Sequence, residues 1–254
     1  MTFDDRQGED PSSGEPERRT GPGAFGESRR EPVFNIPTIL MIFLALPLAV
    51  YLIETQFLSY EAQNRLLSFF SFRPERYLHP LLDQDLGWLF GPVSYSFLHG
   101  SLAHVGFNTV WMAVFATPVA RRLSHVSFIL FWIFSAAFSA FFFAFSVGFE
   151  PTYLIGASGV VSATSGAVCR FAISTSGFAP GQLEHRAPRL TILGALQRPS
   201  VLAFAGFWIV SNLLLGLGFG GGPNESPVAW QAHIGGFLFG YLTFGLFDRK
   251  QVRP

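Results

Sequence analysis

Long apolar stretches separated by short polar links fill most of the chain. A helix needs about 20 largely apolar residues to cross a bilayer. Six stretches contain no Asp, Glu, Lys or Arg: Val33–Ile53, Leu86–Ala120, Leu123–Phe149, Pro151–Cys169, Pro199–Asn224 and Ser226–Phe247. The second is long enough to include part of an entry loop, and the glycine-rich end of the fifth should stop its helix near Leu217. The pattern predicts an all-α fold, a polytopic membrane helix bundle with six transmembrane helices.

Polar segments flank and interrupt this membrane domain, which we place at residues 33–248. Residues 1–32 are hydrophilic and rich in Gly, Pro, Glu and Arg, so we expect a disordered tail, and residues 249–254 form a second, short tail. Residues 54–85 form a long first loop, which either lies in the membrane interface or packs as an ordinary external loop. Its large apolar residues are Leu66, Leu67, Phe69, Phe70 and Phe72.

Composition agrees with a membrane location. Hydrophobic residues make up 49% of the chain and charged residues 13%, whereas a soluble domain carries about 25% charged residues. The net charge is zero, so nothing indicates a nucleic-acid partner. Cys169 is the single cysteine, which excludes an intramolecular disulfide and fits a small buried hydrophobe.

Basic residues mark one face of the predicted bundle. They fall in both tails and in the links after the second and fourth stretches, whereas the opposite face has only Arg65, Arg73 and Arg76. Loops rich in Arg and Lys stay in the cytoplasm, so both termini are expected there. The residues on the basic face are Arg6, Arg18, Arg19, Arg29, Arg30, Arg121, Arg122, Arg170, Arg186, Arg189, Arg198, Arg249, Lys250 and Arg253.

Polar side chains inside the apolar stretches are costly in lipid, so each needs a reason. In the second stretch His104 and Asn108 are four residues apart and share one helix face, while His99 lies nearer the helix entrance. In the sixth, His233 adjoins a row of small residues that includes Gly236 and lets another helix approach closely. Hydrogen bonds between helices could account for each of these residues singly.

The fourth stretch opens with the sequence Gly156-Ala157-Ser158-Gly159. The glycines let another backbone or a substrate come close, and a serine at a helix N-terminus has free N–H groups beside it that suit a developing oxyanion. Packing of the small row Ser158, Ser162 and Gly166 against another helix is the structural alternative. If this row packs on the small residues of the sixth stretch, His233 comes near Ser158 and can act as its base.

Together these clusters resemble the rhomboid family of intramembrane serine proteases. The matching segments are H-G-S-L-A-H-V-G-F-N, G-A-S-G-V-V-S-A and A-H-I-G-G-F-L-F-G. Their order and spacing are similar to those of the six-span bacterial form, over roughly Val33 to Asp248. The chain differs at Ser162, where some members carry an aromatic residue, and at Phe90-Gly91, where some carry Trp-Arg.

The resemblance implies an intramembrane serine endopeptidase that cuts membrane-protein substrates in or near their transmembrane segments. It implies a dyad of Ser158 as nucleophile and His233 as base. The oxyanion would be bound by the side chains of His104 and Asn108 and by the Ser158 backbone N–H, with His99 as a structural histidine. Three glycines are expected beside the site: Gly156, Gly159 and Gly236.

No cofactor and no metal are expected, and the partners would be transmembrane protein substrates and the lipid bilayer, most simply in a bacterial cytoplasmic membrane. The oligomeric state is open. One alternative is a catalytically inactive rhomboid-like protein that binds or escorts membrane clients, although such relatives typically lose the serine or the histidine. A small transporter or channel is another, but it predicts polar residues along several spans, and the first and third stretches are almost purely apolar.

The base is expected to have no acidic partner, because no Asp or Glu occurs inside the six stretches. Asp248 follows His233 by 15 residues, about 22 Å along one helix. Helix packing along Ala232, Gly236 and Gly240 is therefore predicted to orient His233.

Topology gives the first testable prediction. A reporter fused after Pro254 should be cytoplasmic and one inserted near Gly222 should be external, because the arginine-rich loops stay inside. Fusions to alkaline phosphatase, which is active only outside the cytoplasm, measure this. The reverse pattern of activities would reject the topology.

Overall fold

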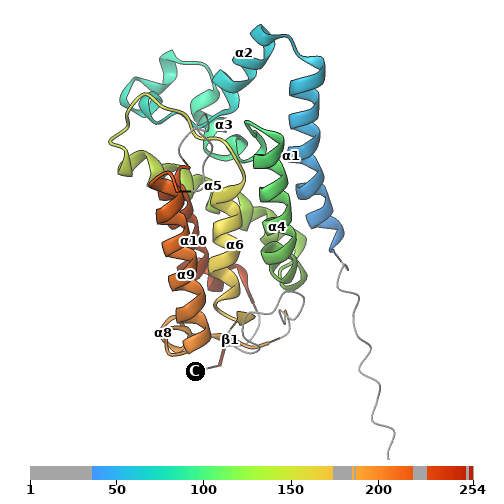
Figure 1. Ribbon diagram of the computed structural model, residues 1–254, viewed down its shortest axis with the longest axis vertical. Coiled ribbons are helices and arrows are strands. Elements are labelled where there is room, and N and C mark those ends of the chain that lie inside the picture. The colour runs from blue at the N-terminus through green and yellow to red at the C-terminus, as the bar shows by residue number, and fades with distance from the viewer. Residues whose placement is uncertain (1–35, 174–184, 186, 220–227, 250–251, 254) are drawn as a thin grey trace, which may run out of the picture. The chain divides into compact units, whose positions relative to one another are not determined.

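The computed structural model describes residues 36–173, 185, 187–219, 228–249 and 252–253, which fall in one compact unit, Ile36–Pro254 (Figure 1). The predicted tail at 1–32, residues 250, 251 and 254 of the predicted C-terminal tail, and Gly222 lie outside the described residues. The elements are α1 (Thr38–Phe57), α2 (Tyr60–Phe70), η1 (Pro74–Leu78), η2 (Leu81–Asp83), α3 (Gly87–Ser94), η3 (Tyr95–Phe97), α4 (Leu102–Arg122), α5 (His125–Ser146), α6 (Ser158–Val168), β1 (Arg189–Leu190), α8 (Ile192–Leu196), α9 (Pro199–Gly216), α10 (Trp230–Phe247) and β2 (Val252–Arg253).

The helical membrane fold expected from the sequence is confirmed. Among the described residues, the helices α1, α4, α5 and α9 are long and apolar enough to cross a membrane. The fourth and sixth apolar stretches form α6 and α10, with 11 and 18 residues. The arrangement is compatible with six spans, and that number stays a prediction.

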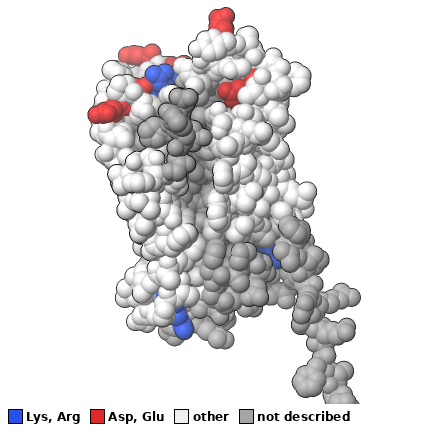
Figure 2. Space-filling model, in the orientation of Figure 1, with Lys and Arg blue, Asp and Glu red and all other residues white. Residues whose placement is uncertain are grey.

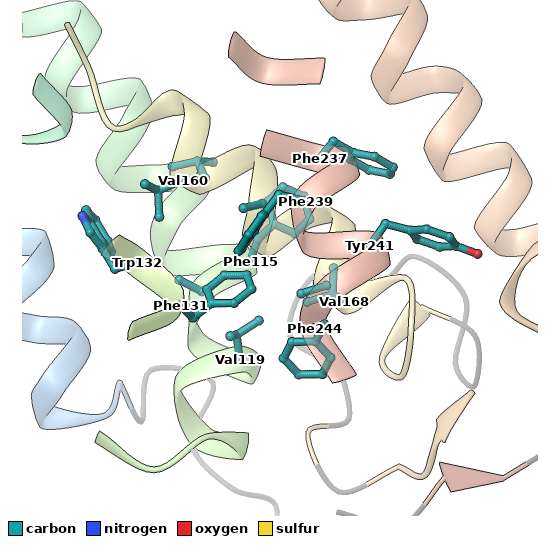
Figure 3. Packing of buried hydrophobic residues seen from close by; sticks show 14 of the residues in the cluster. Phe115, Val119, Phe131, Trp132, Val160, Val168, Phe237, Phe239, Tyr241 and Phe244 are labelled. Carbon is teal, nitrogen blue, oxygen red and sulfur yellow. The ribbon is translucent and has the colours of Figure 1, made fainter. Parts of the chain in front are cut away.

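Helix α6 stands at the centre of the bundle, with α4, α5 and α10 packed around it. Every residue from Gly159 to Val168 is buried. Large apolar side chains of the surrounding helices meet around it, as Figure 3 shows for Phe115 of α4, Phe131 of α5 and Phe244 of α10. The remaining labelled members of this cluster are Val119, Trp132, Val160, Val168, Phe237, Phe239 and Tyr241.

Backbones of α6 and α10 touch along a row of small residues. A Cβ added to Gly240 would overlap the carbonyl oxygen of Ala163, and one added to Gly236 would overlap the carbonyl oxygen of Gly159. From the other side, a Cβ on Gly166 would overlap the backbone of α10. Helices approach this closely only where both lack side chains at the contact. We call this row the α6–α10 seam.

Buried arginines tie together the C-terminal ends of α4, α6 and α10. The Nε atom of Arg122, at the end of α4, donates to Oδ2 of Asp248, directly after α10, over 3.0 Å. Arg170, just after α6, donates through Nη1 to the Tyr241 carbonyl in α10 over 2.6 Å. These contacts place the three helices parallel, so their N-terminal ends meet at the opposite end of the bundle.

The surface of the bundle is divided as a membrane protein requires. On the face drawn in Figure 2, acidic side chains gather at the end that carries α2, basic side chains appear at both ends, and the surface between them is uncharged. Much of that middle zone is apolar: Phe207 on α9 is 73% exposed and Met41 on α1 is 57% exposed. Large apolar side chains in such numbers on a surface indicate contact with lipid.

The first loop packs in part against the bundle. Phe72 is fully buried, and its backbone pairs antiparallel with Leu154, just upstream of α6, through hydrogen bonds of 3.2 and 2.8 Å. Arg76 donates to Asp85 and so holds the pKa of that carboxyl below its usual range. Helix α2 itself has no buried residue, and its place in the membrane interface stays a prediction.

The α6–α10 seam gives a prediction on stability. Gly240→Ala should lower the free energy of unfolding by about 1–3 kcal/mol, because its Cβ forces two backbones apart. Thermal unfolding in detergent measures the shift in Tm. The matched control is Gly206→Ala in α9, where a Cβ meets nothing within 4 Å and Tm should stay or rise. Equal shifts for both variants would mean that the close approach carries no stability.

Candidate functional site

Ser158 is the first residue of α6. The first hydrogen bond of the helix runs from Val161 N to the Ala157 carbonyl over 2.9 Å. The N–H groups of the first turn therefore have no acceptor within the helix, and that of Ser158 is among them. Such groups can bind a negative oxygen beside the serine hydroxyl.

The loop that leads into α6 is held by hydrogen bonds from each side. Gly156 N donates to the Tyr95 carbonyl over 2.9 Å. Ala157 N donates to Nε2 of His99 over 3.3 Å. His99 is 3% exposed, so its ring is a buried support for the backbone next to Ser158. This contact gives His99 a structural role.

Gly156 lies next to both His104 and Ser158. Its φ of +111° lies in a region that residues with a Cβ rarely adopt. A Cβ added there would lie 2.6 Å from Nε2 of His104 and 3.8 Å from Oγ of Ser158. His104 also meets the ring of His99 edge-on, with 4.9 Å between the ring centroids. The bare glycine is what allows the imidazole of α4 to approach the start of α6.

Asn108 lies one turn further along α4 on the same face as His104. Its side chain is 7% exposed, and Nδ2 donates to the His104 carbonyl over 2.9 Å. A carboxamide nitrogen has two N–H groups. One is used within the helix, and the other remains for a further acceptor.

His233 lies in the first turn of α10 and is 9% exposed. One turn later, Gly236 rests on the carbonyl of Gly159, which places the start of α10 against the start of α6. Within the described residues no hydrogen bond joins Ser158 to His233. The residues that the sequence singled out thus gather at one end of α4, α6 and α10.

Sequence reasoning missed Asn212 of α9. Its Oδ1 lies 2.6 Å from Nδ1 of His233. The expectation that helix packing alone orients His233 is therefore incomplete. The signal was available, since Asn212 is a carboxamide in an otherwise almost wholly apolar span.

Carboxylates stand apart from this cluster where the structure describes them. Asp248 is 3% exposed and pairs with Arg122 and Arg189 at the opposite end of α10. Glu150 is exposed in the turn after α5. Among the described residues, no three His, Cys, Asp or Glu side chains are grouped to hold a metal ion.

Apolar helices with lipid-facing surfaces and a polar cluster at one end define a multi-pass integral membrane protein. The family model for the Rhomboid domain matches residues 87–249, well over half of the chain. The chain therefore belongs to the rhomboid family, whose members are typically intramembrane serine proteases and also include inactive homologues. No curated protein matches the chain.

Gly156 gives a prediction on the site. Gly156→Ala should slow the reaction of Ser158 with a fluorophosphonate probe at least tenfold, because the new Cβ displaces the His104 ring. The matched control is Gly148→Ala, which also has a positive φ, +67°, but meets nothing within 4 Å. Both variants carry backbone strain, and only the first disturbs the site. Equal labelling rates for the two would argue that His104 does not act on Ser158.

Proposed function

We propose that this protein is an active intramembrane serine endopeptidase with Ser158 as nucleophile and His233 as base. One observation carries the proposal. The parallel helices α4, α6 and α10 bring His104, Ser158 and His233 to the same end of the bundle, with the serine at a helix N-terminus.

The chemistry follows from the properties of these groups. A serine hydroxyl is a weak nucleophile until a base removes its proton, and we assign that role to His233, which lies in the first turn of α10 beside the start of α6. Attack on a peptide carbonyl forms a Ser158 ester through a tetrahedral intermediate, and the histidine then passes the proton to the leaving amine. Water hydrolyses the ester in the reverse sequence of proton transfers.

Charge on the carbonyl oxygen appears only during this reaction. In this proposal three donors bind that oxygen: the backbone N–H of Ser158, an imidazole N–H of His104 and the remaining N–H of Asn108; the approach of His104 to the start of α6 supports it. Donors of this kind, fixed before the reaction and shielded from water, are worth several kcal/mol in other enzymes, about 3 kcal/mol for one donor.

The position of the site indicates its substrates. The site lies at the end of the bundle opposite the buried arginines, and hence at the external side if the arginine-rich end is cytoplasmic. A membrane protein with one transmembrane helix could place an unwound segment of that helix there. We infer cytoplasmic termini and a bacterial cytoplasmic membrane on the same grounds.

Two substitutions test the proposal. Ser158→Ala and His233→Ala should each reduce fluorophosphonate labelling, and cleavage of co-expressed single-pass membrane proteins, by several orders of magnitude, because nucleophile and base act as one unit. The matched control is Ser165→Ala, which removes a hydroxyl that donates within α6 to the Val161 carbonyl over 3.0 Å. It should keep wild-type rates.

The same measurements separate the alternative. Wild-type protein that is folded but neither labels nor cleaves any substrate in the panel would identify an inactive, client-binding member of the family. Cleavage that persists in Ser158→Ala would reject the assigned nucleophile.

A further inference from the structure

Asn212 is a buried polar side chain in a helix that is otherwise mostly apolar and largely exposed. Its exposed fraction is 8%, and on α9 only Val201 and Phe204 are buried with it. A carboxamide in a membrane span is costly unless its hydrogen bonds are made inside the protein. Its placement therefore calls for a specific partner.

Three successive turns of α9 face three turns of α10, and Asn212 occupies the middle one. One turn before it, the Trp208 ring stacks on Phe237 with 4.8 Å between centroids. One turn after it, a Cβ on Gly216 would overlap the ring of Trp230. The helices run antiparallel, and these two contacts fix their alignment on either side of Asn212. Asn212 is therefore held directly opposite His233.

The orientation of the Asn212 amide is set within its own helix. Nδ2 donates to the Trp208 carbonyl over 2.8 Å, which turns Oδ1 toward Nδ1 of His233 at 2.6 Å. The opposite orientation would set the amide oxygen against the Trp208 carbonyl, two acceptors facing each other. A carboxamide oxygen can only accept, so Nδ1 of His233 must carry the proton. In a neutral imidazole the other nitrogen, Nε2, then holds the lone pair.

We propose that Asn212 is a positioning residue that holds His233 in the tautomer with its proton on Nδ1. This rests on the proposed function, in which Nε2 of that histidine removes the serine proton. In the described part of the chain no carboxylate and no stacked aromatic ring reaches His233. Ser162, one turn below Ser158, donates within α6 to the Ser158 carbonyl over 2.6 Å.

A neutral amide suits this position better than a carboxylate would. Soluble serine proteases use a buried aspartate, and an asparagine in its place is harmful there because it favours the wrong tautomer. Here the Trp208 carbonyl occupies the amide N–H, so the oxygen is what the histidine meets. The same hydrogen bond is made without placing a charge in a membrane span.

Substitution of Asn212 tests the proposal on the full-length protein in detergent or lipid. Asn212→Leu should lower kcat about tenfold or more with KM nearly unchanged, the size expected for one hydrogen bond to the base. Asn212→Asp in its protonated form, which burial in a membrane span favours, donates its O–H to the Trp208 carbonyl and presents its other oxygen to Nδ1, so it should recover most of the rate. The matched control is Ser211→Leu, since the Ser211 hydroxyl only donates within α9 to the Phe207 carbonyl.

Two results would overturn the proposal. One is wild-type kcat for Asn212→Leu, which would mean that the hydrogen bond does not matter. The other is an equal loss in Asn212→Leu and Asn212→Asp, which would assign the side chain to packing. If Asn212→Leu lowers Tm as well as kcat, the Asn212→Asp variant decides between the two explanations. The proposal then requires Asn212→Asp to recover both the Tm and the kcat of the wild type.

Nitrogen NMR of the imidazole separates this proposal from the proposed function. In ¹⁵N-histidine-labelled wild-type protein the His233 signals, identified by their loss in His233→Ala, should show the proton on Nδ1, and Asn212→Leu should show a mixture of tautomers. A proton on Nε2 in wild type would overturn the inference. An inactive wild type with the proton on Nδ1 would reject the protease function and leave the assigned hydrogen bond intact.

Discussion

Contact between the backbones of α6 and α10 is the constraint on which the site depends. Gly236 and Gly240 rest on the carbonyls of Gly159 and Ala163, so neither helix can shift along the other without a collision. Ser158 directly precedes one contact, and His233 lies one turn before its partner. The register of the seam thus sets the relation of the two residues, and apolar packing around α6 maintains it. Side chains on the seam would be incompatible with this register.

Polar contacts also hold the helices and the site residues in place, at both ends of the bundle. At one end, Arg122 and Asp248 form a buried ion pair that joins α4 to α10. Buried ion pairs contribute more to the choice of one arrangement than to net stability, because desolvation offsets much of their attraction. At the other end, His99 supports the loop before α6, and Asn212 holds His233. Each of these side chains is buried with a partner, as the interior of a membrane protein requires.

The sequence predicts the helices well because lipid imposes a simple pattern. The helix α9 ends at Gly216, beside the predicted stop at Leu217, and α5 lies inside its apolar stretch. Among relations between distant segments, the small residues predicted the packing of α6 on α10, but other contacts were beyond the sequence. The pairing of Phe72 with Leu154 and the partner of Asn212 depend on tertiary contacts that leave no local period. The length of α6 was also not foreseen, because its apolar stretch includes the loop that precedes Ser158.

That length has a consequence for how the protein meets the bilayer. The 11 residues of α6 rise about 16 Å, roughly half of the hydrocarbon thickness of about 30 Å. With the arginine-rich end at one membrane surface, the start of α6 lies well below the other. For the proposed protease, the thickness of the bilayer then affects access to the site: a thicker bilayer lengthens the path that water and a substrate backbone must take, and a thinner one shortens it. Lipid composition, which touches no residue of the site, thereby becomes a determinant of turnover by the proposed protease.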